Sequence, residues 1–213
     1  MFKSLKATDS QNLKAYVDFD NASLEENKVY GAMFSNIVVC LLGAFYINSA
    51  IIFKAVAVAL SLFFVASMIW FKFKVSKTQT NIKLYFGCYM TAIAVILCYD
   101  SCLFFGKTGI GSLVPAVIYV VALPLVFIAK IKSECKKIVS GKFVGKSAPP
   151  ILKGVISGAA VLGTTTSRFL YDKINVEIVF GFAFGFLGIV LGAASRFFVK
   201  WYCHKLLEQR ETE

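Results

Sequence analysis

The chain is poor in the residues that carry most enzyme chemistry. His204 is its only histidine, so a nucleophilic triad, a histidine metal site or a histidine general base has no second candidate. Asp and Glu total only 12 of 213 residues, and Asp100 is the only carboxylate well inside an apolar run. Active sites usually gather several titratable groups. We therefore expect a protein that is not an enzyme and that holds no metal and no cofactor.

Charge is the second scarcity. Charged residues make up 16% of the chain, whereas a soluble domain has about 25%. Hydrophobic residues make up 58%, and the mean hydropathy is +0.71. With this composition, we expect the lipid bilayer to be the main solvent of this protein. The apolar runs also leave no stretch large enough for a separate soluble domain.

Six apolar runs are long enough to cross a bilayer about 30 Å thick. The sequence thus predicts an all-α, polytopic membrane protein, a six-transmembrane-helix bundle. The predicted spans are 30–47, 50–71, 82–105, 110–131, 151–170 and 176–199.

The basic residues predict the orientation of this bundle. Of the 23 lysines and arginines, 19 fall in the N-terminal segment, the second and fourth connections and the C-terminal end. An excess of this kind marks the cytoplasmic side. We expect a cytoplasmic leader over 1–28, a membrane domain over 29–203 and a cytoplasmic tail over 204–213. The other three connections are short, which predicts three tight hairpins on the outer side.

The net charge of +11 is explained by these membrane-flanking lysines. Anionic lipid headgroups attract such residues, so we expect headgroups at the cytoplasmic face as partners and no nucleic acid. The leader mixes lysines and aspartates with apolar residues. It is expected to form either an amphipathic helix lying on the membrane surface or a loosely ordered polar segment.

Small residues recur along one face of the last predicted span. Stripes of this kind let two helices approach closely in a membrane. The residues are Gly181, Gly185, Gly188, Gly192 and Ser195, and the preceding span adds Gly154 and Gly158. One interpretation is that spans 151–170 and 176–199 pack against each other. The alternative is that this face docks a helix of another membrane protein or of a second copy.

Four ionisable residues lie at one depth, toward the outer ends of the spans: Lys54, Asp100, Arg168 and Glu177. Because charge is costly inside a membrane, such residues often mark functional sites. If they face inward, Asp100 pairs with Lys54 or Arg168 in a polar vestibule. If Lys54 and Arg168 instead extend to the headgroups, Asp100 remains to be explained. Pro115 and Pro124 are further expected to bend the fourth span.

Two functional hypotheses follow. In the first, the protein is non-catalytic and binds and modulates another membrane component through its small-residue faces, as an auxiliary subunit or an immunity-type protein. In the second, it transports or captures a small solute or ion at the vestibule around Asp100. In either case we expect an integral protein of a bacterial cytoplasmic membrane.

Single cysteines introduced into a cysteine-free background test the predicted topology. Lys77→Cys and Lys137→Cys should be protected from a membrane-impermeant thiol reagent in intact cells, and Lys107→Cys should be labelled, because lysine-rich connections stay cytoplasmic. Labelling of positions 77 and 137 from opposite sides of the membrane would contradict the predicted topology.

Overall fold

The computed structural model describes residues 2–18, 24–47, 51–108, 110–141 and 176–212, and every regular element within them is helical. Five helices are long and apolar enough to cross a membrane, as expected of an integral membrane protein. The elements are α1 (Phe2–Lys6), α2 (Ser10–Asp18), α3 (Glu26–Leu42), the π-helical turn η1 (Gly43–Ile47), α4 (Ile51–Lys74), α5 (Gln79–Gly106), α6 (Leu113–Val139), α8 (Val176–Gly192), the 3-10 turn η2 (Ala193–Ser195) and α9 (Arg196–Glu211).

Five of the predicted spans correspond to α3 with η1, α4, α5, α6 and α8. The span predicted at 151–170 lies outside the described residues, together with Gly154, Gly158 and Arg168. Several helices are longer than predicted, and the extra turns lie at the lysine-rich end. The helix predicted to end at 199 continues through η2 and α9 to Glu211, so most of the predicted tail is helical.

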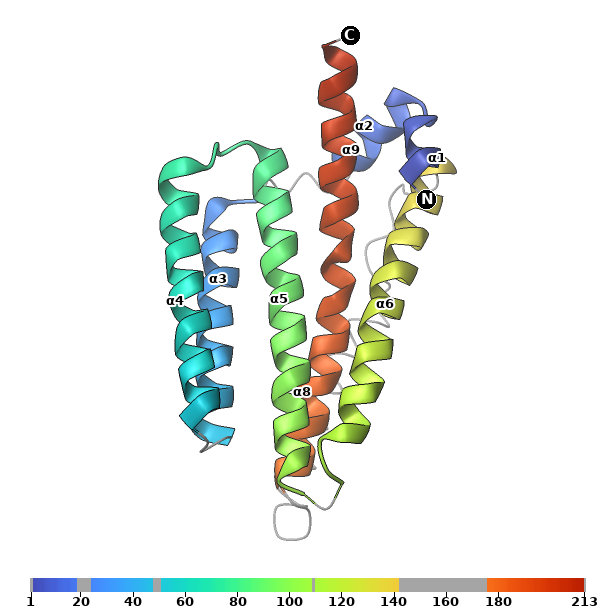
Figure 1. Ribbon diagram of the computed structural model, residues 1–213. Coiled ribbons are helices and arrows are strands. Elements are labelled where there is room, and N and C mark those ends of the chain that lie inside the picture. The colour runs from blue at the N-terminus through green and yellow to red at the C-terminus, as the bar shows by residue number, and fades with distance from the viewer. Residues whose placement is uncertain (1, 19–23, 48–50, 109, 142–175, 213) are drawn as a thin grey trace, which may run out of the picture.

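The long helices stand side by side with α5 near the centre (Figure 1). On one side of α5 lie α3 and α4, and on the other lie α8 and α6. Both termini and the α4–α5 connection are at one end of the bundle, and the α5–α6 connection is at the other (Figure 1). Because α6 and α8 run in the same direction, the residues on either side of the gap at 142–175 lie at opposite ends.

The outer faces of α4 and α6 are apolar. Ile51 is 84% exposed, and Val120 is 74% exposed. Large apolar faces of this kind are unfavourable in water but match a hydrocarbon solvent. The buried side chains therefore lie on the opposite faces, where the helices contact one another.

The glycine face of α8 packs directly on α5. The backbone of α8 comes close enough that an added Cβ at Gly181 would lie 2.8 Å from Cε2 of the Phe105 ring, and one at Gly188 would lie 2.8 Å from the Ala94 carbonyl oxygen. Ser101 of α5 donates a hydrogen bond to the Gly181 carbonyl, and its Oγ lies 2.8 Å from the hydroxyl of Tyr119 on α6. Small residues and interhelical hydrogen bonds both favour such contacts in membranes.

This contact gives the glycine face a partner that the sequence did not suggest. The structure places α5 against Gly181 and Gly188, Gly185 between Tyr119 of α6 and Ser101 of α5, and α6 beside Gly192, while the expected partner segment 151–170 lies outside the described residues. The physical reason is that α5 offers its own small or polar side chains at matching intervals, Ala94, Cys98 and Ser101. Ser195, at the C-terminal end of the face, is fully buried, and its Oγ lies 3.5 Å from the Phe127 carbonyl oxygen.

The N-terminal helices α1 and α2 pack against the rest of the protein, and the expectation that the leader lies on a membrane surface stays a prediction. Their apolar side chains are buried against the lysine-rich end of α6 and against α9. The cluster comprises Leu5, Leu13, Tyr16, Val17, Ile131, Cys135, Ile138, Val199, Cys203 and Leu206. The last three fall at helical spacing along α9, which gives that helix an apolar face where the predicted span ends.

Polar contacts hold the N-terminal helices in the same place. Tyr16 donates a hydrogen bond of 3.0 Å to Glu134, whose carboxylate also pairs with Lys130 and Lys137 at 3.1 and 3.0 Å. Arg210 of α9 donates to the carbonyl oxygens of Lys6 and Thr8. Burial raises the pKa of the Tyr16 phenol far above its usual value, with the Glu134 carboxylate adding to the effect, so Tyr16 stays a hydrogen-bond donor.

Gly188→Ala tests the close α5–α8 contact. The new Cβ would lie 2.6 Å from Cys98 Sγ and 2.8 Å from the Ala94 carbonyl oxygen, so the backbone of α5 has to move. We expect the free energy of unfolding in detergent to fall by about 1–3 kcal/mol. Gly192→Ala is the matched control, because its Cβ would meet Leu123 at an ordinary 3.4 Å. Equal stability of the two variants would contradict this packing.

Candidate functional site

Asp100 lies on α5, six residues before the helix ends, and its side chain is 1% exposed. Its carboxylate is pressed against the main chain of α3 at Gly43. A Cβ at Gly43 would overlap the carboxylate oxygens, so only glycine leaves room for them. Gly43 is also the first residue of η1, where α3 changes from α-helical to π-helical winding. Single π-helical turns in helices frequently occur at functional sites.

One oxygen of this carboxylate is unsatisfied. Within the described residues, Asp100 Oδ2 is buried and has no hydrogen-bond partner. Buried polar atoms are normally paired, so each exception calls for an explanation. Asn36 Oδ1 and Ser61 Oγ share this property, but neither group carries charge and neither lines the cavity described next.

A cavity of about 370 Å³ lies beside the Asp100 carboxylate. It is bounded by α3 with η1, by α4 and by α5, and its walls are almost entirely apolar. The lining residues are Cys40, Ala44, Val56, Ala57, Leu60, Val95, Ile96, Tyr99, Asp100 and Leu103. Small-molecule sites are typically apolar cavities of about 300–1,000 Å³ with a few polar groups that fix the ligand. Among the described residues of this lining, Asp100 alone carries a charged group.

The predicted vestibule of four charged residues is only partly present in the described chain. Lys54, in the first turn of α4, lies over the ring of Phe45, 5.7 Å from its centroid, and the ion pairs within the described residues do not join it to Asp100. Glu177 is half-buried in the first turn of α8, away from the cavity lining. Arg168 lies outside the described residues. Asp100 thus has no cationic partner in the part of the chain that is described.

Sequence reasoning identified Asp100 but missed the other walls of its cavity. The contribution of α3 was the largest omission, because Cys40, Gly43 and Ala44 read as ordinary small residues in an apolar span. A glycine at the end of such a run was the available signal, since isolated glycines often mark a close approach. Tyr99 directly precedes Asp100 in the sequence, but only the structure shows that its side chain also lines the cavity.

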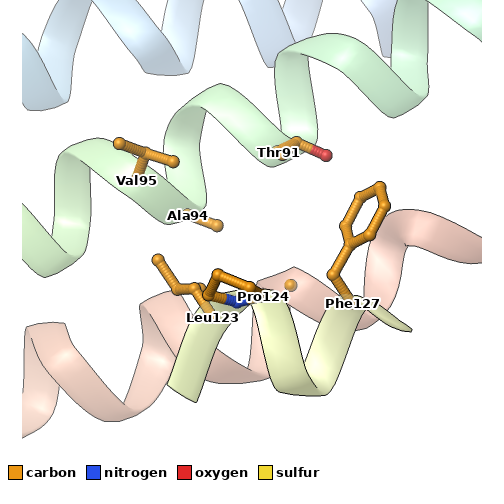
Figure 2. Close-up of a pocket in the computed structure, with 7 residues that line it drawn as sticks. Thr91, Ala94, Val95, Leu123, Pro124 and Phe127 are labelled. Atoms are coloured by element: carbon orange, nitrogen blue, oxygen red, sulfur yellow. The ribbon is translucent and has the colours of Figure 1, made fainter. Parts of the chain in front are cut away.

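A second cavity of about 300 Å³ lies between α5, α6 and α8. Figure 2 shows Thr91, Ala94 and Val95 of α5 facing Leu123, Pro124 and Phe127 of α6. It contains no ionisable group, so it offers less chemistry than the Asp100 cavity. Of the two prolines expected to bend α6, Pro124 lies inside the helix. Pro115 lies in the first turn of α6, where backbone N–H groups have no intrahelical partner, so its missing N–H breaks no hydrogen bond of the helix. The expectation that Pro115 bends α6 is therefore corrected.

No protein-family model, no curated protein and no solved structure matches this chain. The geometry of the Asp100 cavity carries its own chemical meaning. An unpaired carboxylate oxygen accepts hydrogen bonds and attracts positive charge, and both interactions are stronger where water is excluded. The apolar walls add contact area without competing for the same group.

Gly43→Ala tests the contact between Gly43 and Asp100. The new methyl group displaces the carboxylate, so we expect the free energy of unfolding to fall by about 1–3 kcal/mol. Gly31→Ala on the same helix is the matched control, because nothing lies within 4 Å of its added Cβ.

A double-mutant cycle separates this contact from a general effect on α3. With Asp100→Ala as background, Gly43→Ala should cost little, since the overlapping oxygens are gone. Unfolding in detergent measures all four proteins, and additive effects of the two substitutions would show that the residues do not interact.

Proposed function

We propose that this protein binds a small solute in the Asp100 cavity and acts as a solute carrier or a solute-capture subunit in the membrane. The observation that supports this most strongly is the buried, unpaired carboxylate oxygen at the edge of a 370 Å³ apolar cavity. A polar group left without a partner in a packed interior is costly. A bound solute that contacts Asp100 removes that cost, and the solute gains affinity for the same reason.

The partner-binding hypothesis loses part of its support. It relied on small-residue faces, and the face formed by Gly181, Gly185 and Gly188 is already covered by α5 and α6. Gly154 and Gly158 lie outside the described residues, so a partner docked there stays a prediction. The two hypotheses differ in which residues matter: a solute requires Asp100, whereas a helix partner requires the glycines.

The proposal includes six spans with both termini in the cytoplasm of a bacterial cell. Two observations support it. The residues on either side of 142–175 lie at opposite ends of the bundle, and a crossing at 151–170 accounts for this. The basic connections and both termini meet at one end, as the excess of lysine on the cytoplasmic side requires.

A ligand screen on the purified protein in detergent tests the proposed function. Cationic, neutral and anionic compounds are compared for their effect on the unfolding temperature, because a ligand that binds only the folded state stabilises it. At least one compound should stabilise the wild type and lose that effect in Asp100→Asn. At 100 times the dissociation constant the expected stabilisation is about 2.7 kcal/mol.

Two further variants complete the screen. Ala57→Leu reduces the cavity without touching the carboxylate and should also weaken binding. Glu177→Gln removes a carboxylate outside the cavity lining and should leave binding unchanged. The proposal is wrong if no compound distinguishes the wild type from both cavity variants. A stoichiometric protein partner that co-purifies regardless of Asp100 would favour the partner-binding hypothesis instead.

A further inference from the structure

The charges around Asp100 restrict what the cavity accepts, if the protein binds a solute as proposed. Among the described residues, the groups that face the carboxylate and are able to titrate are Cys40 of α3 and Tyr99 of α5. The wall formed by α4 is apolar, and Lys54 on that helix lies over Phe45. Within the described residues, an anionic solute would meet a carboxylate with no compensating cation, and a zwitterion would leave its own carboxylate unpaired. Both are disfavoured.

Inorganic cations are disfavoured by the number of available ligands. Hard cations such as Ca²⁺ take six to eight oxygen ligands, and Mg²⁺ takes six. The cavity lining offers one carboxylate and one tyrosine hydroxyl among ten residues. A single ion pair is enough, in contrast, for an organic ammonium group whose remaining surface is apolar. Its N–H groups match the acceptor that Asp100 Oδ2 leaves free.

The size and the walls of the cavity fit an ammonium ion with an apolar body. A volume of 370 Å³ equals the liquid volume of about 12 water molecules, which is enough room for a body of roughly a dozen non-hydrogen atoms. Leu60, Ile96 and Leu103 supply apolar contact. The ring of Tyr99 adds an aromatic surface, which attracts cations.

The empty cavity must also keep Asp100 neutral. An ionised carboxylate with no partner in a membrane interior is very costly, and such a group takes up a proton instead. Asp100 lies six residues from the end of α5, or about 9 Å along the helix, so the distance to water is short. When an ammonium ion enters, the O–H bond of the carboxyl breaks, the proton leaves to water, and a carboxylate–ammonium pair forms. Charge balances with one proton released for each cation bound.

We infer that the solute is a monovalent organic ammonium ion with an apolar body, and that it exchanges with a proton on Asp100. The protein is thereby suited to couple movement of an organic cation to movement of a proton in the opposite direction. This inference rests on the proposed function and adds to it the class of solute and the coupling ion.

The experiment uses matched pairs of probes and the full chain in detergent. Benzylammonium, cyclohexylammonium and 2-phenylethylammonium are each compared with the alcohol of the same skeleton, which keeps the size and a hydrogen-bond donor but removes the charge. Binding is measured by calorimetry, and repetition in buffers with different heats of ionisation counts the protons released.

At least one ammonium ion should bind with release of about one proton, and its alcohol should bind at least tenfold more weakly. The dissociation constant should fall about tenfold for each unit that the pH rises, over the pH range in which Asp100 is protonated in the absence of solute. Asp100→Asn should abolish both binding and proton release, Ala57→Leu should weaken binding with the carboxyl intact, and Glu177→Gln should match the wild type.

The alternative outcomes separate this inference from the proposed function. Failure of every ammonium ion to bind, or binding without proton release, overturns the exchange. If a neutral or anionic solute from the screen requires Asp100, the solute-binding proposal stands and the cation inference falls. If no solute of any charge requires Asp100, both are overturned.

Discussion

The close approach of α8 to α5 is the contact on which the rest of the bundle depends. In hydrocarbon there is no hydrophobic force to bring helices together, so packing and interhelical hydrogen bonds must do so. Gly181, Gly185 and Gly188 remove the side chains that would keep the two backbones apart, and Ser101 supplies a hydrogen bond across the interface. With this pair in place, α5 becomes a shared wall with a different role on each side.

The two sides of α5 have different roles, because one side packs against α8 and the other lines the cavity. Ala94, Cys98 and Ser101 form the stripe that meets α8. Ile96, Tyr99 and Asp100 turn toward α3 and α4 and line the cavity. Because successive residues on a helix differ by about 100°, neighbours such as Asp100 and Ser101 face different partners. Ser101 is hydrogen-bonded in a packed interface, whereas one oxygen of Asp100 has no partner among the described residues and lies beside the cavity.

Much of the architecture was predictable because the membrane imposes simple rules on a sequence. Apolar runs had to become helices, and five of the predicted spans are helices in the structure. Asp100 stood out for a similar reason, since a carboxylate inside such a run is unfavourable without a purpose. The partners of these residues were less predictable. The contact of Gly43 with the Asp100 carboxylate was not visible in the sequence, nor was the burial of Leu13 and Tyr16 against α6 and α9.

The sequence by itself determined that lipid is the main solvent, that the fold is helical, and that Asp100 is the carboxylate well inside an apolar run. It did so because hydropathy and charge are properties of each residue. Only the tertiary structure decided that α5 covers the glycine face, that α3 approaches Asp100 at Gly43, and that a cavity remains between α3, α4 and α5. These features depend on the relative rotation and register of helices. Apolar side chains on every face of a membrane span leave that rotation open until the helices pack.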